Sequence, residues 1–220
     1  MKTLIFFFLM SAVLIVNGQN AKYSTYYLQR KSLFEVLPDT KREIVFLGNS
    51  ITDGGEWSEL FNNKHAKNRG ISGDTTDGVL FRLNEVTRSK PAKVFLLIGI
   101  NDLSRGVSKD SVLSNICSIA LKVRKDSPKT KVYIQSILPV NDSFGLFKNH
   151  TNKTDDVLWV NAQLKIWCEK EHFQFVDLFS KFKCVDSNLL NPELTNDGLH
   201  LKGEGYLLWV EIVKPYISSK

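Results

Sequence analysis

The sequence predicts an α/β fold, a three-layer α/β/α sandwich in which a five-stranded parallel sheet lies between two layers of helices. The first observation behind this prediction is that short apolar runs rich in β-branched residues alternate with longer stretches of helical periodicity. The second is that a helical stretch follows each run, which is the order that a parallel sheet needs. The predicted strands cover residues 43–47, 66–71, 93–100, 131–138 and 174–178.

The third and fourth of these runs contain the segments VFLLIGI and VYIQSIL, which are almost wholly apolar. Strands with both faces buried have this composition, so we expect helices to cover both faces of the sheet. Asp74 and Ser108 directly precede two of the helical stretches and are predicted to cap them. The predicted helices cover residues 57–62, 75–89, 109–125, 154–171 and 203–217.

The composition is that of a folded globular protein. Of the 220 residues, 43% are hydrophobic and 24% are charged, which excludes a disordered chain and a small disulfide-rich domain. Residues 20–220 are expected to form one domain. The net charge is +6, but the basic residues are scattered and form no stripe, so we expect no nucleic-acid partner.

The first 19 residues have the layout of a secretory signal peptide. Lys2 precedes an apolar run over residues 4–16, and small and polar residues follow it. The run is too short to span a bilayer comfortably, and no later segment is apolar enough, so we expect no stable membrane insertion. Cleavage is predicted near Gly18 or Gln19, which makes the mature protein secreted or periplasmic.

The chain has three cysteines, so at least one thiol stays unpaired within it. Export would permit a disulfide between Cys168 and Cys184, and the sequence leaves this question open. Cys117 lies on the apolar face of a predicted helix and is interpreted as core filling. There is no Cys-x-x-Cys motif and no His/Cys cluster, so we expect neither a metal site nor a cofactor.

Polar residues gather where the predicted strands end and just before the last helix. Ser50 follows the first strand, Gly70 lies in the second, and Asn101 follows the third. Asp197 and His200 stand shortly before the last helix. Ligands of open parallel sheets bind outside the carboxyl ends of the strands, so we expect these residues to meet there.

These residues stand in four short blocks: Gly48-Asn49-Ser50, the segment from Asn68 to Asp74, Gly99-Ile100-Asn101-Asp102, and Asp197-Gly198-Leu199-His200. In this order and at these separations, the blocks resemble those of the GDSL-type (SGNH) hydrolase superfamily over essentially the whole mature chain. The resemblance implies the flavodoxin-like SGNH hydrolase fold. One position departs from the pattern, since Asn49 stands where the family usually has aspartate. Asn is nearly isosteric with Asp, so we expect the nucleophile to stay in place.

Acyl transfer explains why these residue types belong together. A serine hydroxyl becomes a nucleophile when a base removes its proton, and histidine is a base near neutral pH. Asp197, three residues before His200, can hold one imidazole nitrogen and leave the other facing Ser50. The resemblance assigns the catalytic roles to these three residues. It also implies an oxyanion hole made by the backbone N–H groups of Ser50 and Gly70 and the side-chain amide of Asn101.

The expected activity is that of an exported serine esterase that cleaves short-acyl, acetyl-type carboxylic esters through an acyl-serine intermediate. The resemblance implies short-acyl activities, among them removal of acetyl groups from sugars and from platelet-activating-factor-like lipids. Because the chain is expected to be exported and its sequence shows no long apolar acyl tunnel, carbohydrate esters are the favoured substrates, and lipid esters are the other small-molecule partners considered. One alternative is a lysophospholipase or thioesterase that acts on longer acyl chains. A non-catalytic carbohydrate-binding module is the other, and it would be expected to lack a member of the triad. The oligomeric state is not readable from the sequence.

Three aromatic residues are candidates for contact with the substrate: Trp57 near the serine, and Phe144 and Phe147 in residues 139–156. That segment follows the fourth strand, so we expect it to overhang the ligand crevice. A substrate-recognising lid and an inert surface loop are both consistent with its sequence. No second base is needed, so His150 is expected to be packed or solvent-facing.

Overall fold

The computed structural model of the protein describes residues 22–218, so the predicted signal peptide lies outside the described residues. The described residues divide into two compact units, with the boundary between Leu37 and Pro38. The first contains helix α2 (Thr25–Val36), which begins after Ser24, whose hydroxyl accepts a hydrogen bond from the Tyr27 N–H group. In the described part of the chain, no helix is both long enough and apolar enough to cross a membrane.

The second unit contains the predicted sheet. All of its strands run parallel, in the order β2-β1-β3-β4-β5. This finding confirms the five-stranded parallel sheet. The strands are β1 (Ile44–Gly48), β2 (Ala66–Gly70), β3 (Lys93–Leu97), β4 (Lys131–Gln135) and β5 (Gln174–Val176).

The five predicted helices are all present, and each of them begins and ends within two residues of the prediction. Several short helices join the strands to them, and these were not expected. The helices of this unit are α3 (Ser50–Asp53), α4 (Trp57–Leu60), α5 (Thr76–Thr87), α6 (Ile100–Ser104), α7 (Lys109–Asp126), α8 (Lys148–Thr151), α9 (Thr154–Glu171), α10 (Phe179–Phe182) and α11 (Gly203–Ser218). Two 3₁₀ turns cover Asp142–Phe144 and Pro192–Leu194.

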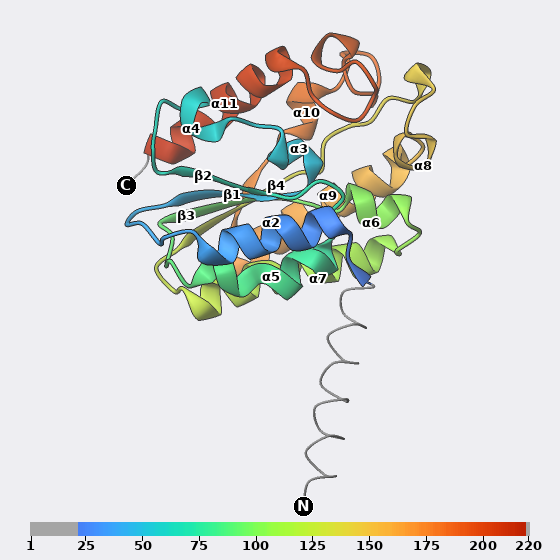
Figure 1. The fold of residues 1–220 in the computed structure, drawn as a ribbon. Helices are drawn as coiled ribbons and strands as arrows, with labels where there is room; N and C mark the ends of the chain where they lie inside the picture. The colour runs from blue at the N-terminus through green and yellow to red at the C-terminus, as the bar shows by residue number, and fades with distance from the viewer. Residues whose placement is uncertain (1–21, 219–220) are drawn as a thin grey trace, which may run out of the picture. The chain divides into compact units, whose positions relative to one another are not determined.

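Alternate side chains of each strand point to opposite faces of the sheet, and helices bury them on both faces. Val45, Leu47 and Val94 belong to one apolar core together with residues of α5, α7 and α9. Phe46 and Phe95 belong to a second core together with residues of α4, α10 and α11. Figure 1 shows α5 and α7 below the sheet and α4 and α11 above it. The three-layer sandwich is therefore confirmed.

Two kinds of boundary differ from the prediction. The third and fourth strands end three residues early, although the apolar runs continue: Ile98 and Ile137 are buried in the loops that follow. The residues after the two strand ends are apolar because the loops that contain them are buried, and not because the strands continue. Ser108 caps α7 as predicted, but the cap of α5 is Thr75, whose hydroxyl accepts a hydrogen bond from Gly78. Asp74 bonds Arg82 instead.

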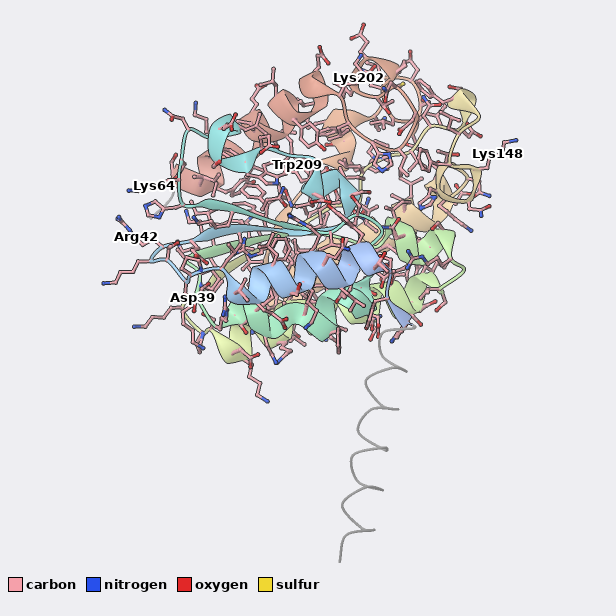
Figure 2. All side chains as sticks on the ribbon, in the orientation of Figure 1. Asp39, Arg42, Lys64, Lys148, Lys202 and Trp209 are labelled. Atoms are coloured by element: carbon pink, nitrogen blue, oxygen red, sulfur yellow. The ribbon has the colours of Figure 1, made fainter. Side chains whose placement is uncertain are left out.

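The structure contradicts the assignment of Trp57 to the substrate site. Only 1% of its surface is exposed. Its ring stacks on Phe46 with centroids 4.1 Å apart, and it meets the ring of Trp209 edge-on at 4.8 Å. Trp209 lies between α11 and the sheet in Figure 2. The indole N–H donates to the Thr52 carbonyl at 2.9 Å, so the polar atom is also satisfied inside the core.

The three cysteines are free thiols, so the disulfide between Cys168 and Cys184 is absent from the structure. Cys168 of α9 is part of the apolar core that the residues of α5, α7 and α9 form against the sheet. Cys117 of α7 packs against that core. Cys117 is thus core filling, as its helical position predicted.

We expect Trp57→Ala to lower the free energy of unfolding by ~3–5 kcal/mol, because it removes a fully buried ring and leaves a cavity. Trp159, which is only half-buried, is the control, and its change to alanine should cost less. Urea denaturation of both variants measures the difference. Equal losses would contradict the placement of Trp57 in the core.

Candidate active site

The carboxyl ends of β1, β2 and β3 lie side by side, and the loops that leave them form the candidate site. Gly48 is paired with Gly70 of β2 and with Leu97 of β3. A Cβ atom on Gly48 would lie 2.3 Å from the Leu97 carbonyl oxygen, so only glycine fits this junction. The chain can therefore turn at once from β1 into α3, whose first residue is Ser50.

Asn49 organises this turn. Its side-chain oxygen caps α3 by accepting a hydrogen bond from the Ile51 N–H group at 3.1 Å. The residue is fully buried, and its side-chain nitrogen has no partner among the described residues. Asparagine in place of the family's aspartate thus keeps the turn and leaves the Ser50 hydroxyl accessible.

The structure brings together the three residues expected to form a triad, although Ser50 and His200 are 150 positions apart in the sequence. The Ser50 hydroxyl lies 3.0 Å from Nε2 of His200. Nδ1 of the same ring lies 2.7 Å from Oδ2 of Asp197. Hydrogen bonds therefore join the three side chains in the order serine, histidine, aspartate.

The Asp197 carboxylate is held by its own turn. Its Oδ1 accepts hydrogen bonds from the N–H groups of Leu199 and His200, each at 2.8 Å. Burial raises the pKa of Asp197, but the hydrogen bonds from His200 and Leu199 outweigh it, so the pKa lies below its usual value. The carboxylate form is the one that can accept from the imidazole and from both N–H groups at once.

The structure does not support Gly70 as an oxyanion donor. Its N–H group already donates to Oδ1 of Asn68 at 2.8 Å, and a Cβ here would lie 2.1 Å from the backbone nitrogen of Asp53. Gly73, three residues later, lines the same pocket as Ser50. The N–H groups of Ser50 and Gly73 have no hydrogen-bond partner among the described residues, so both are available to a ligand.

Asn101 lies near the start of α6, and its amide is fixed from two sides. Its nitrogen donates to the Asp74 carbonyl at 2.8 Å, which leaves a second N–H for the pocket. Its oxygen lies 3.0 Å from Nε2 of His150. Because that oxygen can only accept, His150 carries its proton on Nε2. Burial first, and then the charges of His200 and Arg105, lower the pKa of His150, which favours the neutral ring.

Sequence reasoning missed His150, because a single histidine in a polar loop carries no motif. The one available signal was the position of the loop after the fourth strand. Asp102, next to Asn101, ties α6 to the start of α5: its carboxylate accepts from the Thr76 hydroxyl at 2.6 Å and from the Thr76 N–H group.

A pocket of about 400 Å³ opens beside the serine hydroxyl. Phe147 is 45% exposed and lies edge-on to the His200 ring, with centroids 5.0 Å apart. Phe144, the other aromatic candidate in that loop, does not line the pocket and packs near Gly198 instead. The lining residues are Ser50, Gly73, Asn101, Ser104, Arg105, Phe147, Asn149, His150, Leu199 and His200.

Three of these lining residues belong to the segment 139–156, which therefore overhangs the crevice as expected and forms part of the site's wall. A larger hollow of about 730 Å³ lies where β4 begins and contains none of the predicted site residues. Its size does not make it the site, because the hydrogen-bonded serine and histidine lie in the smaller pocket. Between residues 22 and 218, no group of three or more His, Cys, Asp or Glu residues is arranged to hold a metal ion.

A buried cation lies beneath the loops of the site. The side chain of Arg82 has no solvent exposure and pairs with the carboxylates of Asp74 at 2.9 Å and Glu85 at 3.1 Å. It also donates to the carbonyls of Gly48 at 3.3 Å and Arg69 at 2.8 Å, at the ends of β1 and β2. Burial raises the pKa of Asp74 to about 6 against the opposing effect of the guanidinium.

A parallel α/β sandwich with a hydrogen-bonded serine, histidine and aspartate at the carboxyl ends of its strands is an arrangement typical of acyl-transferring hydrolases. The family comparison agrees. The chain belongs to the GDSL-like Lipase/Acylhydrolase family, whose model matches residues 46–208.

Individual relatives are similar over most of their length. Platelet-activating factor acetylhydrolase IB subunit alpha1 from Rattus norvegicus is 35% identical over 174 residues, which is 76% of this chain and 72% of the rat protein. A GDSL-like lipase from Bacteroides thetaiotaomicron superposes with a TM-score of 0.75 and 27% identity, covering 87% of this chain and 96% of the lipase. An acetyl-xylooligosaccharide esterase from Geobacillus Stearmophilus shares the fold, with a TM-score of 0.60, 20% identity and coverage of 82% and 96%.

Because the pKa of Asp197 is lowered in the folded state, we expect its contribution to the free energy of unfolding to depend on pH. The folded state favours the carboxylate, so this group stabilises the fold above its unfolded pKa of ~4. That contribution is lost as the pH falls through the lower, folded pKa. We therefore expect Asp197→Asn to cost more unfolding free energy at pH 7 than at pH 3, measured by urea denaturation. The exposed Asp186→Asn is the control, and an equal cost at both pH values would contradict the prediction for Asp197.

Proposed function

We propose that the protein is a serine esterase that hydrolyses carboxylic esters through an acyl-Ser50 intermediate. The observation that carries this proposal is the hydrogen-bonded chain from Ser50 through His200 to Asp197, at 3.0 and 2.7 Å. Membership of an acylhydrolase family supports it further. A non-catalytic carbohydrate-binding module would have no need of this geometry.

In the first half of the reaction, His200 takes the proton of the Ser50 hydroxyl as the oxygen attacks the ester carbonyl carbon. The carbonyl oxygen becomes an oxyanion. The N–H groups of Ser50 and Gly73 and the second N–H of the Asn101 amide stabilise that charge. The tetrahedral intermediate then expels the alcohol, which receives the proton from His200, and leaves the acyl group on the serine.

In the second half, His200 takes a proton from water as the water attacks the acyl-serine. The carboxylic acid leaves, and Ser50 regains its proton. Asp197 holds the imidazole in the orientation that both halves need and stabilises its charged form. Gly73 replaces Gly70 in this scheme, because the Gly70 N–H is already bonded to Asn68.

We infer that the acyl group is short and that acetyl esters, with carbohydrates as the first alcohols to try, are the substrates. The small pocket of about 400 Å³ supports this, with Phe147 and Leu199 as its apolar residues. The names of the rat acetylhydrolase and the xylooligosaccharide esterase point the same way. Values of kcat/KM that rise from acetyl through butyryl to octanoyl esters would support a lysophospholipase or thioesterase instead. We also propose export, on the signal-peptide pattern of residues 1–19.

A fluorophosphonate probe tests the proposed nucleophile. We expect it to label the wild-type protein and to leave Ser50→Ala unlabelled, because only an activated hydroxyl attacks the phosphorus atom. Turnover of p-nitrophenyl acetate near pH 8 should be lost in the same variant. Ser58→Ala, in the short helix α4, is the matched control and should keep both. A wild-type protein that is neither labelled nor active would contradict the esterase proposal and favour a non-catalytic carbohydrate-binding module.

The oxyanion hole predicts graded effects on turnover. Asn101→Ala should lower kcat by ~10²–10³, because it removes a donor aimed at the developing charge. His150 lines the pocket and holds the Asn101 amide, and we propose that it serves as a positioning residue for that amide. His150→Ala should therefore lower kcat less, by about tenfold, with KM little changed.

His150→Gln, which offers another N–H donor, should recover part of the kcat that His150→Ala loses. Steady-state kinetics and thermal melting on the same samples separate the roles. A large drop in melting temperature with intact kcat would make Asn101 and His150 structural.

A further inference from the structure

One permanently charged side chain lines the pocket beside Ser50, and it is Arg105. This residue follows α6 directly and is exposed. One of its guanidinium nitrogens donates to the Gly73 carbonyl at 2.8 Å, on the loop that carries a proposed oxyanion donor. Over residues 22–218, it forms no ion pair with a carboxylate.

The carboxylates around the site are committed to other partners. Each of them is wholly or largely buried and accepts hydrogen bonds from groups on its own side of the pocket. None of them forms a direct ion pair with Arg105, although burial raises the pKa of Asp102 and the charge of Arg105 acts to lower it. The pairs are Asp74 with Arg82, Asp102 with Thr76, and Asp197 with His200.

The charge of Arg105 acts within the pocket rather than only on the outer surface. It contributes to the lowering of the pKa of His150, on the loop that overhangs the site. Lys148, which is close to His150 in the sequence, points outward in Figure 2 and does not line the pocket. A guanidinium has five N–H donors in a flat fork that matches the two oxygens of a carboxylate or phosphate, and the structure commits one of them.

We propose that Arg105 forms an anion-binding subsite that selects esters whose leaving alcohol carries a carboxylate or phosphate group. The anion belongs to the alcohol because the proposed acyl group is too short to carry a second anchor. This inference rests on the proposed esterase function of the same pocket. It narrows the substrates from neutral acetylated alcohols to anionic ones.

The hydrogen bond from Arg105 to Gly73 also supports the Gly73 loop. The test must therefore separate this structural effect from the binding of an anion. Loss of support for the Gly73 loop would slow all esters by the same factor. Loss of an anion subsite would slow anionic esters selectively. The informative quantity is therefore the ratio of kcat/KM for an anionic ester to that for a neutral ester of the same shape.

The experiment compares 3-acetoxybenzoate with 3-acetoxybenzamide in the full-length protein. From wild type to Arg105→Gln, we expect the anionic-to-neutral ratio to fall by about tenfold, the range of one charge-assisted hydrogen bond. Arg105→Lys keeps the charge without the fork and should retain part of the preference. Added salt should lower the wild-type ratio, because it screens an exposed charge.

Arg124→Gln is the matched control, since Arg124 is also exposed and also donates to a backbone carbonyl, that of Glu171 at 2.9 Å. It lies at the other end of the sheet, in the hollow beside the start of β4. Its ratio should equal that of wild type. A third ester, 3-acetoxyphenyl phosphate, identifies the preferred anion: a larger fall in Arg105→Gln for this ester than for the benzoate assigns the subsite to phosphate, and the reverse assigns it to carboxylate.

A ratio that is the same in wild type and Arg105→Gln for both anionic esters would overturn the subsite while leaving the esterase in place. An equal fall in Arg124→Gln would also overturn it, because the effect would then come from overall charge. Absence of turnover of every ester, together with absence of fluorophosphonate labelling, would instead overturn the proposed function itself.

Discussion

The site depends on the buried guanidinium of Arg82. It binds the last carbonyl of β1 at Gly48 and the carbonyl of Arg69 near the end of β2, and it neutralises the carboxylates of Asp74 and Glu85. The two loops that carry the free N–H groups leave the sheet at these strand ends. One side chain with no contact with solvent thus binds both strand ends, in addition to the pairing of Gly48 with Gly70 in the sheet. Removal of either partner from such a buried pair leaves an uncompensated charge, so the arrangement tolerates little change.

From this cation, a line of hydrogen bonds leads to the pocket. Asp74 presents its carboxylate to Arg82 and its backbone carbonyl to the amide of Asn101. His150 holds the other end of that amide from a different loop. A buried polar network in which each member is paired is rigid, because every alternative rotamer leaves a donor or acceptor unsatisfied. The amide thus presents nitrogen, and not oxygen, to the place where negative charge develops in the proposed reaction.

The sequence was sufficient for the architecture because it depends on periodicity: apolar runs and helical spacing specify the layers and the parallel sheet. The order of the strands came from the structure. The short sequence blocks also predicted the serine, histidine and aspartate: the serine closely follows a strand, and the aspartate and histidine stand together just before the last helix. The sequence was insufficient where three-dimensional contacts decide. Gly70 ends β2 and Gly73 lies in the loop that follows, and it is the hydrogen bond that the Gly70 N–H donates to Asn68 that excludes the first. Trp57 is close to the serine in sequence, yet its ring turns into the core. His150 belongs to no catalytic motif.

The wall of the pocket has a practical consequence for producing the protein. Asn149, one of the lining residues, begins the triplet Asn-His-Thr, which a eukaryotic secretory pathway recognises as an acceptor for N-linked glycans. A sugar attached there would stand at the mouth of the pocket and shield the serine hydroxyl from large alcohols. Bacterial expression avoids this modification. Material secreted from yeast or insect cells needs enzymatic deglycosylation, or an Asn149→Gln change, before its substrate preference is compared.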